Sequence, residues 1–284
     1  MEQRSDDWRL ARRGRITGSV VGAVLGHSPF MSKDDVIRSM VREYHGAPSE
    51  FVGGPHIDWG VDNEDGAIWQ FEMETGLTVE KCGFFPYEDF AGASPDGLIG
   101  DDTIFECKAP YSKRKTGDFR SIHEQPHYFD QLQMEMIATR RTKAVFYQWS
   151  PCGSNAEYVD FSQDWYDKYM PVIRQAYSEY MSEIDNPEHL EPKRAEVNTQ
   201  ETKLLVDELD QLRDAIAQAE ERRKEVEAAL VKACGERDAI VWGRKLTRVE
   251  RAGSISYAKA VKELAPDADL EKWRGKPSTY WKIG

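Results

Sequence analysis

The fold is decided by Ser94-Pro95-Asp96-Gly97-Leu98-Ile99-Gly100-Asp101-Asp102-Thr103-Ile104-Phe105-Glu106-Cys107-Lys108. The apolar run 103–105 predicts a strand, and the two turn sequences before it predict a hairpin with Leu98-Ile99 as the other strand. Because side chains alternate along a strand, Glu106 and Lys108 should share one face while Cys107 points to the other. The hairpin should then bring Asp96 beside Glu106.

Such a pair of carboxylates suits a hard metal ion. Two negative charges about 4 Å apart repel by roughly 4 kcal/mol at an effective dielectric of about 20, and a divalent cation removes this conflict. Carboxylates without a His or Cys partner favour Mg²⁺ or Mn²⁺. Lys108, on the same face, would be placed to polarise or deprotonate a water. The set of Asp96, Glu106 and Lys108 therefore predicts a phosphodiester hydrolase site.

The alternative interpretation is a surface hairpin on which Glu106 and Lys108 are only neighbouring solvated charges. The context favours the site. A Pro-Asp-Gly turn comes before it, the apolar residues Ile104 and Phe105 lead into it, and a helix is expected downstream over 128–136.

The composition is that of a folded, acidic protein. Of the 284 residues 40% are hydrophobic and 11% aromatic, which argues against a disordered chain, and the net charge is −12. That charge argues against indiscriminate coating of DNA, although a basic channel can lie on an acidic body. The four cysteines lack zinc or iron–sulfur spacing and indicate free thiols in a reducing compartment. Without a signal-peptide pattern or an apolar run of about 18 residues, we expect a soluble, cytoplasmic protein with no membrane partner.

The N-terminal segment 5–19 has the composition of an anion-binding site. Ser5 is expected to cap a short helix that ends at Gly14. Four arginines and two hydroxyl side chains lie within the eleven residues 9–19: Arg9, Arg12, Arg13, Arg15, Thr17 and Ser19. Thr17 or Ser19 would cap a second helix, whose free backbone N–H groups and a nearby guanidinium would cradle a phosphate. The alternative is a solvated basic helix with an ordinary cap.

Residues up to about 185 alternate helices with short strands. Helices are predicted over 32–44, 59–75, 126–139 and 163–184, and strands over 77–79, 83–85, 91–93, 98–99, 103–106, 143–149 and 157–161. This order predicts an α/β core with a mixed central sheet. Tyr128, Gln131 and Glu135 share one helix face, either toward the site or along a buried helix seam. Glu64 is either a site residue or an early-turn acid that complements a helix dipole.

A domain boundary is expected near 186–198, where two prolines break the pattern. Beyond it, apolar residues follow heptad spacing along one long helix, interrupted by Arg223: Leu205, Leu209, Leu212, Ile216, Ala219, Val226 and Leu230. The pattern predicts a coiled coil, either within the chain or between subunits. A basic hairpin over 239–249, with its turn at Gly243-Arg244-Lys245, and a short helix over 257–264 should follow. The aromatic and basic tail 273–282 either contacts nucleic acid or fastens to the core.

Four segments, in this order, resemble the phage lambda exonuclease family, the YqaJ-like viral recombinase nucleases of the restriction-endonuclease-like superfamily. They are residues 8–19, 60–65, 94–108 and 128–133. The resemblance covers about residues 5–185 and implies a restriction-endonuclease-like core, with a mixed central sheet flanked by helices, in a nuclease domain over 1–190. Residues 196–284 do not map onto the family and are interpreted as a C-terminal helical, coiled-coil-like extension.

The resemblance implies a role for each residue of the acidic stretch. Asp96 and Glu106 would be metal ligands together with the backbone carbonyl of Cys107. Lys108 would position or activate the attacking water. Glu64 would hold a second metal, directly or through water.

The resemblance also assigns the flanking residues. Tyr128 and Gln131 would support the nucleophile and the scissile phosphate, while Arg12 and Ser19 would bind the 5′-terminal phosphate. The implied activity is 5′-to-3′ exonuclease action on linear double-stranded DNA, with Mg²⁺ or Mn²⁺ as cofactor. The product, a 3′ single-stranded overhang, would serve a single-strand annealing protein in phage-type recombination.

The implied assembly is a homo-oligomer, a ring of three subunits around DNA, encoded by a phage or prophage and acting in the bacterial cytoplasm. The C-terminal extension would instead permit another assembly or contact with a recombination partner. Two other functions stay open: a structure-specific or restriction-type endonuclease with the same metal site, and a non-catalytic DNA-end-binding scaffold for an annealing protein.

Overall fold

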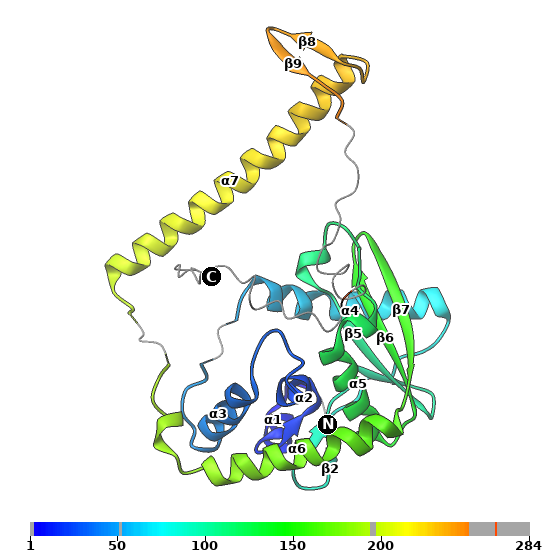
Figure 1. Cartoon of the computed structure of the whole chain (residues 1–284), viewed down its shortest axis with the longest axis vertical. Helices are drawn as coiled ribbons and strands as arrows, with labels where there is room; N and C mark the ends of the chain where they lie inside the picture. Colours follow the sequence, from blue (N-terminus) through cyan, green and yellow to red (C-terminus); the bar gives the residue numbers. More distant parts are fainter. Residues whose placement is uncertain (1–2, 51–52, 194–196, 250–264, 266–284) are drawn as a thin grey trace. The chain divides into compact units, whose positions relative to one another are not determined.

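The computed structural model describes residues 3–50, 53–193, 197–249 and 265, in two compact units, Met1–Ala195 and Glu196–Gly284. Figure 1 colours the elements in chain order. Within the described ranges, no helix is both long enough and apolar enough to cross a membrane.

The core of the first unit is a four-stranded mixed sheet (Figure 1). Its strand order is β4-β5-β6-β7, with the bounds Gly97–Ile99, Thr103–Lys108, Lys143–Ser150 and Gly153–Asp160. β5 pairs antiparallel with β4 and parallel with β6, and β6 pairs antiparallel with β7. The predicted mixed central sheet is therefore confirmed. β5 continues to Lys108, so Glu106 and Lys108 both belong to the strand ladder.

Two helices cover the two faces of this sheet. On one face, Phe71 of α4 (Pro55–Thr75) packs against Phe105 with ring centroids 4.7 Å apart, and Cys107 joins the same cluster. On the other face, Leu132 of α5 (Pro126–Thr139) packs in a cluster with Ile104. The alternation along β5 thus directs Cys107 away from Glu106, as predicted; Cys107 faces α4 and the site face points toward α5.

A second, three-stranded sheet was absent from the predictions. Its strand order is β1-β3-β2, with the bounds Ile16–Thr17, Ala91–Ala93 and Phe85–Tyr87. The strand predicted over 77–79 is wrong, because only Glu80 forms an isolated bridge, with Leu98. The strand predicted over 83–85 is shifted, since the residues that pair with β3 are Phe85–Tyr87.

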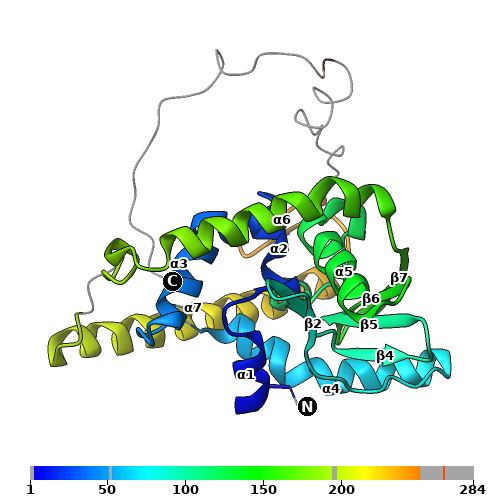
Figure 2. The ribbon, with the colours of Figure 1, turned by 90° about the horizontal axis from the view of Figure 1, so that it is seen from below.

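The remaining helices build a second hydrophobic core beside the sheet. Ser5, Ser32 and Ser162 cap α1, α3 and α6, each accepting a hydrogen bond from a backbone N–H of the first turn. α6 lies along α2 and α3 (Figure 2) and buries Trp165 and Tyr180 in this core. These helices are α1 (Asp6–Arg12), α2 (Gly18–Val24), α3 (Lys33–Tyr44) and α6 (Gln163–Glu183). Short 3-10 turns span Tyr111–Lys113, Ile122–Glu124 and Pro187–His189.

α2 and α5 approach each other at two glycines. A Cβ atom on Gly22 would lie 2.7 Å from the Cβ of His127, which is closer than side chains pack. A Cβ atom on Gly18 would lie 3.3 Å from the Cβ of Ala93 and 3.5 Å from the Cγ of Glu135. The absence of a side chain at these positions is what lets the two helices touch.

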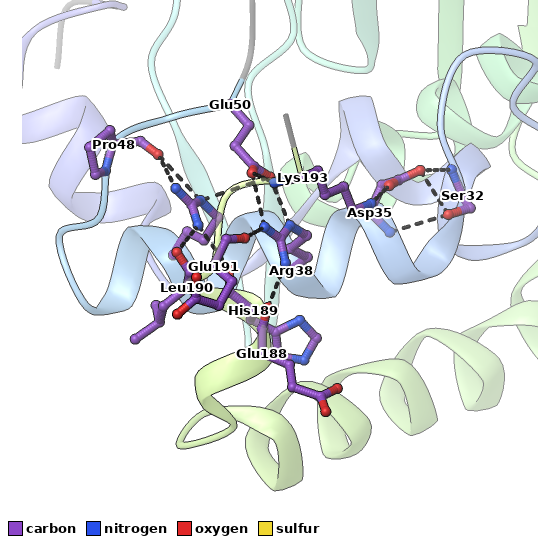
Figure 3. Close-up of polar contacts among 11 residues, drawn as sticks. Ser32, Asp35, Arg38, Pro48, Glu50, Glu188, His189, Leu190, Glu191 and Lys193 are labelled. Atoms are coloured by element: carbon purple, nitrogen blue, oxygen red, sulfur yellow. Dashed lines mark hydrogen bonds and ion pairs between the residues drawn. The ribbon is translucent and has the colours of Figure 1, made fainter. Parts of the chain in front are cut away.

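Two buried arginines of α3 hold the segment that ends the first unit (Figure 3). Arg38 donates to both carboxylate oxygens of Glu50, at 2.7 and 2.9 Å, and to the carbonyl of Glu188 at 2.9 Å. Arg42 donates to the carbonyl of Leu190 at 2.7 Å. Hydrogen bonds from Arg38 lower the pKa of Glu50 to about 2. We call Arg38, Arg42 and Glu50 the arginine clasp.

The second unit contains the long helix α7, Gln200–Ala233, and a hairpin of β8, Ala239–Val241, with β9, Arg244–Leu246. The hairpin is confirmed, but its predicted turn is wrong. Val241 pairs with Arg244, so the turn is Trp242-Gly243, with φ values of 48° and 76° that match a type I′ turn. The predictions for 257–264 and 273–282 lie outside the described residues.

Candidate active site

Asp96 and Glu106 lie side by side at the β4–β5 hairpin. Gly97 pairs with Phe105, and the Asp96 carboxylate accepts the backbone N–H of Cys107 at 2.8 Å. Glu106 is only 2% exposed, so the alternative of a solvated surface hairpin is wrong. Burial, and then the charge of Glu106, raise the pKa of Asp96 well above its ordinary value. The hairpin therefore holds two acidic groups together away from water, where the charged form of Asp96 is disfavoured.

Lys108 supplies positive charge at the edge of this pair. Its Nζ lies 2.5 Å from Glu106 Oε1 and 5.2 Å from the centroid of the Tyr128 ring. Burial acts to lower the pKa of Lys108, but the charges of Glu106 and Asp96 outweigh it, so the pKa is raised. The side chain is therefore held as an ammonium group. The Lys108 side chain is 26% exposed.

α5 adds an amide and a third carboxylate. Gln131 Nε2 donates to Glu106 Oε1 at 2.6 Å and to Glu135 Oε1 at 2.8 Å, so this helix face points to the site. Glu135 is 1% exposed, and burial followed by the charge of Glu106 raises its pKa well above its ordinary value. We call Asp96, Glu106 and Glu135 the carboxylate cluster.

The donors of the carboxylate cluster fit a hard cation in kind. Glu106 Oε2 and Glu135 Oε2 are buried and have no hydrogen-bond partner among the described residues. Leaving buried carboxylate oxygens unpaired is costly, and a divalent cation with a preference for oxygen would satisfy them. Across the described ranges, no group of three His, Cys, Asp or Glu side chains already stands in metal-binding geometry.

The other two predicted metal ligands lie beside the cluster. Glu64 on α4 accepts a hydrogen bond from Arg4 at 2.7 Å, while its charge still raises the pKa of Asp96. The Cys107 thiol faces α4, and burial raises its pKa, so the thiol takes no part in the cluster. The atom predicted to bind metal is instead the backbone carbonyl of Cys107, on β5.

The predicted phosphate-binding residues meet where α1 passes into α2. The Arg12 guanidinium lies over the Trp8 ring, 4.0 Å from its centroid, and donates to Thr17 Oγ1 at 3.4 Å. Ser19 Oγ is 3.3 Å from Thr17 Oγ1, and Ser19 is exposed. Burial lowers the pKa of Arg12. Thr17 occupies the N-cap position of α2, but its hydroxyl makes no capping hydrogen bond, and Ser19 is the second residue of the helix, so the predicted side-chain cap at Thr17 or Ser19 is wrong.

A hydrogen bond connects this junction to the carboxylate cluster. Trp8 Nε1 donates to Ser94 Oγ at 2.8 Å, and Ser94 precedes Asp96 by two residues. Trp8 therefore supports the Arg12 guanidinium and the turn before β4 at once. The predictions omitted Trp8, Ser94 and a role for Glu135 in the site, although the spacing from Tyr128 had placed Glu135 on the correct helix face.

Comparison with known families gives one match. The model of the YqaJ-like viral recombinase domain matches residues 7–142. This range includes the carboxylate cluster, Lys108 and the junction of α1 with α2. No curated protein matches the chain.

Two solved structures share the fold. An alkaline exonuclease, LHK-Exo from Laribacter hongkongensis, is 22% identical with a TM-score of 0.54, over 65% of this chain and 96% of that chain. LHK-Exo in complex with dAMP is 23% identical with a TM-score of 0.54, over 64% of this chain and 95% of that chain. These likenesses confirm the predicted fold class.

Proposed function

Because the model of the YqaJ-like viral recombinase domain matches residues 7–142, we propose that this chain is a metal-dependent nuclease, a 5′-to-3′ exonuclease on linear double-stranded DNA. The observation that carries the proposal is the buried carboxylate cluster with the Lys108 ammonium at its edge. The shared fold with an alkaline exonuclease supports a nuclease in general terms. Digestion would leave 3′ single-stranded overhangs for phage-type recombination with a single-strand annealing protein.

Mg²⁺, or Mn²⁺, would be held by Asp96 and Glu106 with the carbonyl of Cys107, and a second ion by Glu64. When bound, such an ion lowers the pKa of a coordinated water and balances charge on the phosphate. The chain holds its ligands in orientation beforehand. The backbone N–H of Cys107 fixes Asp96, and Gln131 fixes Glu106.

Lys108 is the group placed to act on the attacking water. Since the neighbouring carboxylates keep it as an ammonium, it donates hydrogen bonds and has no lone pair to accept a proton. Its role is therefore to orient the water and to offset the negative charge that develops on the phosphate. Tyr128 and Gln131 lie at the same edge and would hold the water and the scissile phosphate.

Arg12, with the hydroxyls of Thr17 and Ser19, would bind the 5′-terminal phosphate. A guanidinium that is partly desolvated gives strong charge-assisted hydrogen bonds to phosphate oxygens. The Trp8–Ser94 hydrogen bond supports this assignment, because it ties the residue under the Arg12 guanidinium to the turn that carries Asp96. Gripping the strand end at a fixed position relative to the cluster would set the polarity of digestion.

We extend the proposal to assembly, with a ring of three copies around the duplex. A ring would retain a protein of net charge −12 on DNA by topology, where electrostatic attraction alone is weak.

The test is digestion of end-labelled linear duplex, with and without Mg²⁺, beside a covalently closed circle. Linear duplex should lose the 5′-ended strand, faster with a 5′ phosphate, and the circle should survive. Lys108→Ala should abolish hydrolysis while circular dichroism and end binding are unchanged. The matched control is Lys143→Ala, whose side chain on β6 is 62% exposed and should be dispensable. Cleavage of closed circles would exclude the exonuclease, and undiminished hydrolysis by Lys108→Ala would remove the catalytic assignment.

A further inference from the structure

α7 carries an apolar stripe that no described residue of its own unit, 197–249, covers. None of its 34 residues is buried, and Leu205, Leu212 and Ile216 are 58%, 54% and 59% exposed. A helix of this length spans about 50 Å. Long helices owe most of their stability in water to burial of such a stripe, so α7 requires a partner.

The stripe has the register of a coiled coil. Written as heptads, the first core position, a, holds Thr202, Leu209, Ile216, Arg223 and Leu230, and the second, d, holds Leu205, Leu212, Ala219, Val226 and Ala233. Arg223 is the one charged residue in this set of ten. The flanking positions, e and g, decide which helix can lie alongside.

We propose that α7 packs in parallel and in register against α7 of another copy of this chain, an arrangement that the copies of the proposed ring can share. In that arrangement each g residue faces the e residue of the following heptad on the other helix. Glu208 would face Arg213 of the second copy, and Arg222 would face Glu227. These are the two facing positions within α7 where both residues are charged, and the charges are opposite at each. The occupant that complements α7 is therefore α7 itself.

Arg223 favours the same alignment. In register, it lies opposite Arg223 of the second copy, and every apolar core residue lies opposite its own copy. If one helix were shifted along the other by one heptad, Arg223 would instead lie opposite Ile216 or Leu230 of the second copy. Arg223 pairs with Glu227 of its own helix at 2.9 Å, so its charge is balanced and its aliphatic stem can cover the seam. A single polar residue at such a position specifies register at some cost in stability.

The test is disulfide formation in the full-length chain. The background variant replaces Cys152 and Cys234 with serine, and Val226→Cys then introduces a thiol at a d position. In the parallel pair the two residues at position 226 meet across the seam, and mild oxidation should give a covalent dimer on a non-reducing gel. Lys224→Cys, on the outer face of α7, is the matched control and should remain largely monomeric on the same gel.

Charge reversal shows whether the partner is a second copy. Glu208 and Arg213 are five residues apart, so they do not pair within one helix. Glu208→Arg and Arg213→Glu should each lower the yield of Val226→Cys dimer several-fold at low salt, and the two together should restore it. No dimer above the Lys224→Cys level would overturn the proposal, whether α7 then packs antiparallel or on residues 250–284 of its own chain. Failure of the double reversal to restore the yield would overturn it as well.

These variants lie outside residues 7–142. DNA digestion by the same samples is therefore a separate measurement. Samples that digest DNA but form no disulfide would contradict only the α7 proposal. Samples that form the disulfide but digest no DNA would contradict only the proposed nuclease activity.

Discussion

Replacing Glu135 with glutamine should stabilise the metal-free protein, by an amount that grows with pH. The change removes one of three acidic groups around one ammonium group, and glutamine keeps an oxygen that can accept from Gln131. Because the pKa of Glu135 is raised by burial and by Glu106, the folded protein binds a proton that the unfolded chain releases. Wild-type stability therefore falls as the pH rises from the unfolded pKa, about 4.3, toward the folded one. The variant lacks this fall.

The magnitude follows from the geometry around Gln131. Glu106 Oε1 and Glu135 Oε1 lie 2.6 and 2.8 Å from the same nitrogen. They are therefore at most about 5.4 Å apart, and two full charges at that distance repel by ~3 kcal/mol at an effective dielectric of about 20. Partial protonation of Glu135 and the nearby ammonium reduce this to ~1–2 kcal/mol between pH 5 and pH 8. In a unit of this size that corresponds to ~2–8 °C in melting temperature.

The assay is thermal unfolding in EDTA at pH 5, 6.5 and 8, for wild type, Glu135→Gln and the control Glu80→Gln, which changes an exposed carboxylate. The difference between Glu135→Gln and wild type should increase across the series, while the control follows wild type. A melting temperature that is lower than wild type by the same amount at every pH would refute the reasoning. It would show that Glu135 acts as an ordinary hydrogen-bond partner in the packing of α5.

Three further outcomes are expected. Mg²⁺ or Mn²⁺ at about 100 times its Kd should raise the wild-type melting temperature by ~5–11 °C, and Asp96→Asn should lose most of that shift; an equal shift would remove Asp96 from the metal site. Arg12→Ala should weaken the preference for 5′-phosphorylated ends while the exposed Arg9→Ala retains it; equal losses on phosphorylated and hydroxyl ends would contradict the assignment. Since Arg38 lowers the pKa of Glu50 to about 2, wild type should lose stability as the pH falls from about 4.3 toward 2. The melting temperature of Glu50→Gln should fall less steeply over this pH range. Equal slopes of melting temperature against pH for the two proteins would contradict this.

The range of the interactions decides how much of the fold could be predicted. α5 has its predicted bounds, because helical spacing and Pro126 at its start are local signals. α4 begins at Pro55, four residues before the prediction, since Pro55 is the first residue of the helix. The strand expected over 77–79 depends on a ladder partner, which no local signal reports, and that partner is lacking apart from the bridge of Glu80 with Leu98.

The same distinction holds for the candidate site. Strand alternation and two turns were sufficient to bring Asp96, Glu106 and Lys108 together, because all three come from one hairpin. The Trp8–Ser94 hydrogen bond spans 86 residues, and nothing local marks which of the eight tryptophans makes it. The role of Glu135 could not be predicted locally, because it depends on how α5 packs on β5, which brings Glu135 close to Glu106.

The contact at Gly22 fixes the distance between α2 and α5. Since no side chain separates the helices there, their backbones lie in direct contact, with Arg12 and Thr17 leading into α2 and Gln131 carried by α5. If Arg12 binds the strand end and the carboxylate cluster cuts it, as proposed, this backbone contact would fix the distance between the two points and with it the size of the fragment that each turnover removes. A bulkier residue at position 22 would push α2 and α5 apart and change that distance, while Arg12 and the carboxylate cluster would keep their own side chains.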